Sequence, residues 1–415
     1  MRHWKTPKHE TVFIMKCSNR DGRARERPAV ALVFPGDSTD PSASSGTPFS
    51  LANALEGLGV EVVRIRGRAP RIMERAAMAV TVLRWLASAE CGAGSRGGSS
   101  PRAGIEVTMM RSGFARMRLL GLQPAGIVQL GSEFLIESRA PLATFEDQTI
   151  RQALDSGYFA WHLGPRDIAW RLDRQRRIYN RATVCCTRSN WAARSITQDY
   201  GVTPSKLRVI GLGPNRPAAP VARAWDPPRF LFVGKDWERK NGPLLIDTFR
   251  QLRAELPTAR LDVVGGHPRI DCPGVVGHGP LHMREPDDQA HLAALFSEAT
   301  CFVLPSHYEP MGISYVEASA AGLPSIGTCV GGCRDVISQS GRVVDPSKPG
   351  QLLNAMRELA DPKVAAAAGA QALIDSRRYT WPRVAERLLL ALDIRPPGTK
   401  FTEEFLNDAD LRPAA

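Results

Sequence analysis

The sequence lacks any apolar run that approaches the roughly 18 residues of a membrane-spanning helix. Residues 1–28 are polar and basic, without the apolar segment of a signal peptide. C-x-x-C pairs are also missing, because the eight cysteines are scattered and only Cys185 and Cys186 are adjacent. Neither a zinc site nor a disulfide framework is therefore indicated. We expect a cytoplasmic protein with mostly buried free thiols and a basic polar tail over residues 1–28.

The composition is that of a globular protein of more than one domain. Of the 415 residues, 43% are hydrophobic and 23% are charged, which excludes wholesale disorder. A chain of this length exceeds one ordinary hydrophobic core and fits two domains of roughly 200 residues each. Two domains with a cleft between them are the starting expectation.

Positive charge is concentrated in the first half of the chain. The formal net charge is +12, with +14 on residues 1–226 and −2 on residues 227–415. Such a field attracts phospholipid headgroups, a phosphorylated acceptor or nucleic acid, and charge alone does not choose among them. We expect an anionic or membrane-associated partner, with peripheral contact at the inner face of a membrane as one form of it.

Strand and helix patterns alternate along the first half. The apolar run Ala29–Phe34 precedes a small-residue loop and a helical pattern that ends near Leu58. Further strands are predicted at Val60–Ile65 and Gly126–Leu130, which is the rhythm of a parallel α/β sheet. The Gly/Ser-rich residues 91–104 predict a mobile insertion. We predict a first doubly wound, Rossmann-like domain over residues 29–218.

A proline-rich stretch, Gly213–Pro228, predicts the linker between two domains. The strand–helix alternation restarts after it, which predicts a second doubly wound domain over residues 219–395 and a C-terminal tail over residues 396–415. The expected strands and helices are Phe230–Val233, Pro243–Leu256, Ala259–Val264, Asp288–Glu298, Cys301–Leu304, Gly312–Ala321 and Trp381–Leu392. The fold class is therefore α/β, with two Rossmann-like domains facing a central cleft.

The segment after the strand Cys301–Leu304 carries the strongest chemical signal. Glu309 lies just before a helix start, and Glu317 lies about one and a half turns into that helix, roughly 8 Å along its axis. That separation suits the two sugars of a nucleotide diphosphate sugar. Free backbone N–H groups of Gly312, Ile313 and Ser314 would cradle its phosphate. We expect Glu309 to hold the transferred sugar and Glu317 the ribose.

A basic loop opens the same domain. Lys235, Arg239 and Lys240 follow its first strand, at the edge where doubly wound domains bind ligands. Cations there would neutralise the diphosphate as charge grows on it during cleavage of the glycosidic bond. We predict Lys240 and Glu309 as the catalytic pair and place Lys235 and Arg239 in the donor site.

These motifs make the C-terminal half resemble a family 4 retaining glycosyltransferase of the two-Rossmann-domain type called GT-B. The resemblance covers roughly residues 187–381 and rests on Gly234, Lys240, Gly265-Gly266, Pro305-Ser306, Glu309, Gly312 and Glu317. It implies sugar transfer with retention of anomeric configuration, no metal and no cofactor, the leaving phosphate drawing the proton from the incoming hydroxyl. This chemistry fits a donor pocket that has lysines and a helix dipole instead of a carboxylate cluster for Mg²⁺.

The sequence departs from the family pattern in two places. The family usually has arginine where Lys235 stands, and lysine lacks the bidentate fork of a guanidinium. Its N-terminal loop often carries paired glycines near donor and acceptor, where this chain has Ser45-Gly46. We still place Gly46 among the donor-side residues.

The acceptor side is less clearly marked. Glu146, Asp147 and His162 are polar residues near predicted strand ends or helix starts, and we take Asp147 and His162 as acceptor-side candidates. Asp147 has the alternative role of capping a helix that begins near Gln148. The basic segment Arg166–Arg181 fits an interfacial helix or a solvated face packed on its own sheet.

Two other function classes share this architecture. A nucleotide-sugar epimerase would isomerise the donor without any acceptor, and a non-catalytic protein would only bind the sugar nucleotide. The intact glutamates and lysines argue against a dead site. Nucleic-acid binding is disfavoured, because the sequence has no recognisable base-reading motif.

Overall fold

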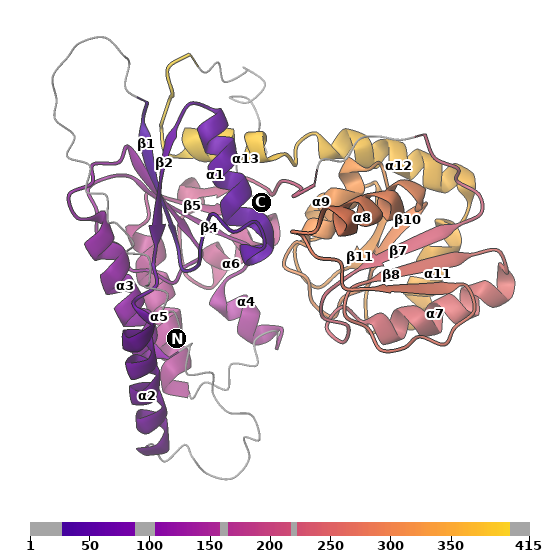
Figure 1. Cartoon of the computed structure of the whole chain (residues 1–415), viewed down its shortest axis with the longest axis horizontal. Coiled ribbons are helices and arrows are strands. Elements are labelled where there is room, and N and C mark those ends of the chain that lie inside the picture. Colours follow the sequence, from indigo (N-terminus) through magenta and orange to yellow (C-terminus); the bar gives the residue numbers. More distant parts are fainter. Residues whose placement is uncertain (1–26, 88–103, 158–164, 217–221, 399–415) are drawn as a thin grey trace, which may run out of the picture.

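Two separate parallel sheets, each flanked by helices, make up the protein (Figure 1). The computed structural model describes residues 27–87, 104–157, 165–216 and 222–398. The predicted insertion 91–104 lies outside these ranges except for Gly104, and residues 1–26 and 399–415 of the two predicted tails lie outside them too. The fold class predicted from the sequence is confirmed.

The first sheet has six parallel strands in the order β2-β1-β3-β4-β5-β6. The four inner strands are almost fully buried, as expected for a sheet covered on both faces, whereas the two edge strands, β2 and β6, are partly exposed. They are β1 (Ala29–Phe34), β2 (Glu61–Arg66), β3 (Gly126–Leu130), β4 (Leu142–Glu146), β5 (Val184–Thr187) and β6 (Leu207–Val209). The helices are α1 (Thr47–Gly57), α2 (Arg71–Ala87), α3 (Ile105–Leu119), α4 (Ile150–Asp155), α5 (Pro165–Arg181) and α6 (Asn190–Gln198), with the short 3-10 turns Ala43–Gly46 and Pro204–Lys206.

The second sheet also has six parallel strands, in the order β12-β11-β10-β7-β8-β9. The strands are β7 (Arg229–Val233), β8 (Arg260–Val264), β9 (Val275–Gly279), β10 (Cys301–Leu304), β11 (Ser325–Thr328) and β12 (Gly341–Val344). The helices are α7 (Gly242–Glu255), α8 (Pro286–Glu298), α9 (Ile313–Ala320), α10 (Arg334–Ile337), α11 (Pro349–Glu358), α12 (Pro362–Ser376) and α13 (Trp381–Ala391). Because β7 and β10 are neighbours, the loops that follow them meet at one edge of the sheet.

The last helix does not stay with the second sheet. Although residues 219–395 were assigned to one domain from the sequence, α13 packs against α1 of the first sheet. Arg387 on α13 donates a hydrogen bond to the carbonyl of Ile210 at 3.2 Å. A chain that crosses back in this way joins the two domains twice, once near residue 216 and once near residue 378.

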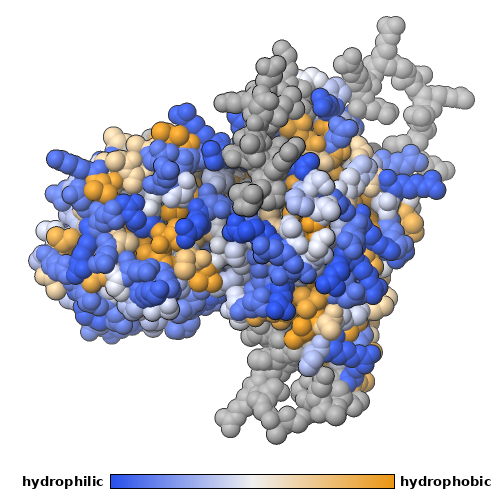
Figure 2. All heavy atoms as spheres, turned by 180° about the vertical axis from the view of Figure 1, so that it is seen from behind, coloured by the Kyte–Doolittle hydropathy of each residue, from blue (hydrophilic) through white to orange (hydrophobic). Residues whose placement is uncertain are grey.

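The surface is mixed in character. On the face shown in Figure 2, apolar residues form separate patches among hydrophilic ones on both domains. In the described parts of the chain, none of the helices combines the length and the apolar character needed to cross a membrane.

Candidate active site at the edge of the second sheet

Lys240 and Glu309 form an ion pair at the carboxyl edge of the second sheet. Lys240 ends the turn after β7, and Glu309 lies in the loop after β10. The two loops are tied together by the backbone of His307, whose N–H donates to the carbonyl of Arg239 at 3.0 Å. Parallel strands that lie side by side therefore bring together two residues that the sequence separates by 69 positions.

Glu309 is buried and held by its surroundings. Its carboxylate also lies 3.8 Å from the Arg239 guanidinium and 3.5 Å from the hydroxyl of Ser306. The loop after β11 packs closely against the backbone of Glu309. A Cβ on Gly331 in that loop would lie 1.8 Å from the Glu309 carbonyl oxygen. The carboxylate is thus held in a fixed position with two cations beside it.

The start of α9 lies next to this pair. Gly312 is the N-cap, with φ of 73°, and a Cβ there would approach the Tyr315 ring to 2.7 Å. Both the backbone angle and the close contact favour glycine. The helix begins at Ile313, one residue after the predicted start at Gly312, so its first N–H groups, including those of Ile313 and Ser314, lie at the positive end of the helix dipole.

Glu317 lies inside α9 and is paired with an arginine from the interdomain linker. Arg216 contacts both carboxylate oxygens, with Nη2–Oε2 at 2.7 Å and Nε–Oε1 at 3.3 Å. The guanidinium also lies 5.1 Å from the centre of the Phe296 ring. A ribose held by Glu317 would therefore share this carboxylate with Arg216 or displace it.

The predicted N-terminal loop lies close to the same linker. Gly46 has φ of 79°, and the two serines before it also have positive φ angles of 46° and 53°. Asn215, next to Arg216, donates a hydrogen bond to the Ser45 carbonyl. A Cβ on Gly46 would come within 2.7 Å of the Asn215 side chain, and this contact together with the positive φ angle favours glycine.

The other residues predicted for the site are Lys235, Asp147 and His162. Lys235 is exposed in the loop after β7, in contrast to the buried Lys240. Asp147 does not cap α4, because Thr149 is the N-cap and forms a capping box with Gln152. Instead, Asp147 lies 3.5 Å from Arg188 and lines a pocket of the first domain. His162 lies outside the described residues.

That pocket has a volume of about 520 Å³ and lies at the carboxyl ends of β1, β3 and β4. The residues after these strands, the start of α1 and one face of α5 line it. Arg171, Arg174 and Gln175 belong to that face because residues three and four apart lie on one side of a helix. The solvated or interfacial helix expected from the sequence therefore turns two of its arginines inward.

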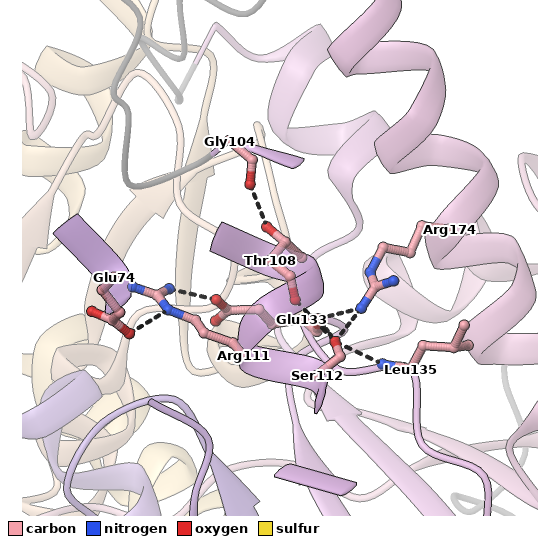
Figure 3. Close-up of polar contacts among 8 residues, drawn as sticks. All are labelled: Glu74, Gly104, Thr108, Arg111, Ser112, Glu133, Leu135 and Arg174. Atoms are coloured by element: carbon pink, nitrogen blue, oxygen red, sulfur yellow. Dashed lines mark hydrogen bonds and ion pairs between the residues drawn. The ribbon is translucent and has the colours of Figure 1, made fainter. Parts of the chain in front are cut away.

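An arginine network forms one wall of the pocket (Figure 3). Arg111 on α3 is bound between Glu74, at 3.0 Å, and Glu133, at 2.5 Å. Arg174 reaches over from α5 to the Ser112 hydroxyl and donates to the Glu133 carbonyl at 3.1 Å. Burial lowers the pKa of Arg174 to about 10, which still leaves it charged at neutral pH.

Glu146, at the end of β4, is a buried carboxyl group in the same pocket. It accepts hydrogen bonds from Tyr179 at 2.6 Å and from Gln175 at 3.3 Å. Burial, more than the nearby Asp147 charge, raises the pKa of Glu146 to about 8. The group is therefore mostly protonated and neutral at pH 7.

One hydrogen bond connects a residue of the pocket lining with the loop that carries Glu309. Gln148 lines the pocket and accepts a hydrogen bond from the hydroxyl of Tyr308, the neighbour of Glu309. On the other side, Ser44 and Thr47 line it next to the loop that Asn215 holds. The described residues contain no group of three His, Cys, Asp or Glu side chains that could hold a metal ion.

Sequence reasoning missed three residues of this region. Arg216 and Asn215 lie in the proline-rich linker, where no periodic pattern indicates a contact, and Arg174 was assigned only to a basic helix face. Its spacing from Arg171 placed both arginines on one side of a helix. The spacing did not show that this side faces a pocket.

Comparison with known proteins supports the interpretation of the second domain. Residues 227–361 match the profile of the family described as glycosyl transferases group 1. A D-inositol 3-phosphate glycosyltransferase from Nocardioides sp. is 27% identical over 256 residues, covering 53% of this chain and 56% of that protein. A glycogen synthase from Mycobacterium tuberculosis is 29% identical over 210 residues, covering 46% and 49%. The chain spans about half the length of these curated relatives.

Solved structures with the same fold cover nearly the whole chain. A sucrose-phosphate synthase from Thermosynechococcus elongatus has a TM-score of 0.62 at 20% identity, covering 87% of this chain and 97% of that one. WaaG, a glycosyltransferase involved in lipopolysaccharide biosynthesis, has a TM-score of 0.60 at 17% identity, covering 89% and 100%. At these identities the likeness concerns the fold. The chain therefore carries a group 1 glycosyltransferase domain in a two-domain GT-B fold, as the motifs around Lys240 and Glu309 predicted.

Proposed function

We propose that the protein transfers a sugar from a nucleotide diphosphate sugar to a hydroxyl group of an acceptor, with retention and without a metal. The observation that carries this proposal is the buried Lys240–Glu309 pair beside the start of α9. Cations and a helix N-terminus bind a diphosphate, and a carboxylate at the same place binds sugar hydroxyls.

Each predicted donor residue has a part in this proposal. Lys240 and Arg239 neutralise the leaving diphosphate, with the N–H groups at the start of α9 as further donors. Glu309 accepts hydrogen bonds from the transferred sugar, and Glu317 accepts them from the ribose. Lys235 is exposed and able to turn toward the outer phosphate.

The proposed reaction takes place on one face of the sugar. The bond between the anomeric carbon and the phosphate oxygen breaks, and the acceptor oxygen bonds to the same carbon from the same side. The acceptor proton passes to the departing phosphate oxygen. Negative charge on the diphosphate grows as the bond lengthens, so Lys240 stabilises the transition state more than the bound substrate.

Thermal-shift measurements test donor binding. Uridine, guanosine and adenosine diphosphate sugars are compared in EDTA, because a ligand that binds only the folded protein raises its Tm. One nucleotide class should raise the Tm of the wild type. A Tm that responds to none of them would contradict the proposal.

A further inference from the structure

The described residues that line the first-domain pocket carry more positive than negative charge. Among them are four arginines, Arg111, Arg171, Arg174 and Arg188. The carboxyl groups on the lining are Glu133, Asp147 and Glu146, and Glu146 is mostly neutral at pH 7. Glu74 pairs with Arg111 but does not itself line the pocket. When Glu74 is counted as well, these residues still carry an excess of positive charge.

The arginines differ in how far the protein neutralises them. Arg111 is bound by two carboxylates, and Arg188 lies beside Asp147. Among the described residues, no carboxylate lies within ion-pairing distance of Arg174, whose polar contacts are a hydroxyl and a carbonyl. A buried cation without a counter-ion is costly, and an anionic ligand in the pocket would supply one.

Two further polar groups on the lining lack a protein partner. In the described structure, the hydroxyl of Thr47, at the start of α1, and Oε1 of Glu146 make no hydrogen bond, although both residues are more than nine-tenths buried. Buried polar groups in native proteins are nearly always satisfied. The start of α1 also brings the positive end of an 11-residue helix to the pocket.

We propose that this pocket is the acceptor site and takes a sugar or polyol that carries a phosphate monoester, with Arg174 as its principal phosphate-binding side chain. The guanidinium fork suits phosphate oxygens, and the excess positive charge suits a group that carries between one and two negative charges. The remaining hydroxyls of the acceptor would extend past Gln148 and Tyr308 toward Glu309. The assignment of the pocket to the acceptor rests on the proposed glycosyl transfer.

Inorganic phosphate is the probe for the anion site. Full-length protein is titrated with phosphate and, separately, with acetate at constant ionic strength, and amide hydrogen exchange locates the bound anion. Phosphate should slow exchange in segments 130–135 and 170–175 and raise the Tm, whereas acetate should do so only weakly. Equal protection by acetate, or protection of segment 235–242 alone, would overturn the assignment.

Variants of α5 supply a matched comparison. Arg174→Gln removes the fork, and Arg177→Gln removes an exposed arginine on the outer side of the same helix. The Kd for phosphate should rise at least about tenfold in Arg174→Gln and stay within about twofold in Arg177→Gln, because a hydrogen bond to a charged group is lost only in the first. Equal Kd values in both variants would contradict the proposal.

A further variant covers the case in which Arg174→Gln does not fold. Arg174→Lys keeps the charge and loses the fork, so its Kd for phosphate should lie between those of the wild type and a protein without the site. A Kd equal to that of the wild type would exclude Arg174 as the phosphate ligand. If a variant does not fold, amide hydrogen exchange in the wild type still shows whether the pocket binds phosphate.

The same exchange experiment separates this proposal from the proposed function. A nucleotide diphosphate sugar should slow exchange in segments 235–242 and 309–317, whatever phosphate does in the first domain. Donor protection without phosphate protection would overturn the acceptor site and leave sugar transfer standing. Phosphate protection in the first domain without donor protection would contradict sugar transfer and leave an anion site.

Discussion

Glu317 pairs with Arg216 and is also the residue that we propose to bind the ribose of the donor. The pair is bidentate and largely buried, with side-chain exposures of 8% for Glu317 and 19% for Arg216. Removing one partner of a buried pair leaves the other charge uncompensated, which destabilises the protein. Any effect on donor binding has to be separated from this effect on stability.

We predict that Glu317→Ala weakens donor binding at least about tenfold, because a charged hydrogen-bond acceptor for the ribose is lost. Glu298→Ala is the matched control, since it removes an exposed, arginine-paired glutamate of the same domain. Kd values for the donor identified by thermal shift are measured by calorimetry, with circular dichroism as the check on folding. A folded Glu317→Ala protein with unchanged Kd would exclude the ribose role.

Glu146 is predicted to make stability depend on pH. Its folded-state pKa of about 8 exceeds its ordinary value of 4.5, so the folded protein binds a proton that the unfolded chain releases between these values. The free energy of unfolding contributed by this group is fully present below about pH 4.5 and is lost as pH rises through about 8. Glu146→Gln should therefore show a flatter decline in Tm between pH 5 and 8 than the wild type.

The control for this prediction is Glu137→Gln, which removes an exposed carboxylate paired with Arg181 at 2.5 Å. Its decline in Tm over that range should match that of the wild type. If Glu146→Gln declines as steeply as the wild type, the carboxyl group is already ionised in the folded protein.

At the scale of elements, the sequence predicted the bounds of several strands but not which elements pack against one another. Ala29–Phe34, Gly126–Leu130 and Cys301–Leu304 were predicted with the bounds that the structure has, because each is an apolar run between turn signals. The start of α9 was predicted because Gly312 marks it. Periodicity also predicted the last helix, but it indicates only that one face is buried and not which sheet covers that face.

Part of the candidate site was also predictable from the sequence. Motif residues on neighbouring strands of a doubly wound sheet must converge, so Lys240 and Glu309 could be placed together. Arg216 and Arg174 could not, because their contacts depend on how a linker and a helix cross between elements distant in sequence. Such crossings are set by three-dimensional packing and leave no local pattern.

The return of α13 to the first sheet predicts a stability effect. Leu388 is fully buried, and Leu388→Ala should lower the free energy of unfolding by about 2–5 kcal/mol, the usual range for leucine truncation in a core. Leu390→Ala, at a partly exposed position of the same helix, should cost less. Urea denaturation of both full-length variants measures the difference, and equal losses would contradict the packing of α13.

At the scale of the whole molecule, the first domain combines positive charge with exposed apolar side chains on α2. Ile72 and Leu83 are 82% and 65% exposed, and Arg71 and Arg75 lie beside Ile72. Apolar and basic side chains on one helix favour an anionic membrane surface. We expect the protein to bind vesicles that contain anionic lipid, and to bind them less tightly as salt concentration rises.

Co-sedimentation with vesicles measures this binding. Ile72→Glu should reduce the bound fraction several-fold, whereas Ile374→Glu, at an exposed position of the second domain, should not. Equal binding of both variants, or equal binding of the wild type to zwitterionic vesicles, would contradict membrane contact through α2.

We propose that Lys240 and Glu309 form a metal-independent site for cleaving a nucleotide diphosphate sugar. The most direct test of this proposal is the rate at which nucleoside diphosphate is released from the donor in EDTA, with a phosphorylated sugar or water as acceptor. The wild type should turn over, Lys240→Ala should lose about a hundredfold in kcat, and the exposed Lys235→Ala should lose less. Release that requires added Mn²⁺ or Mg²⁺, or a folded Lys240→Ala protein whose kcat lies within threefold of the wild type, would contradict the proposed function.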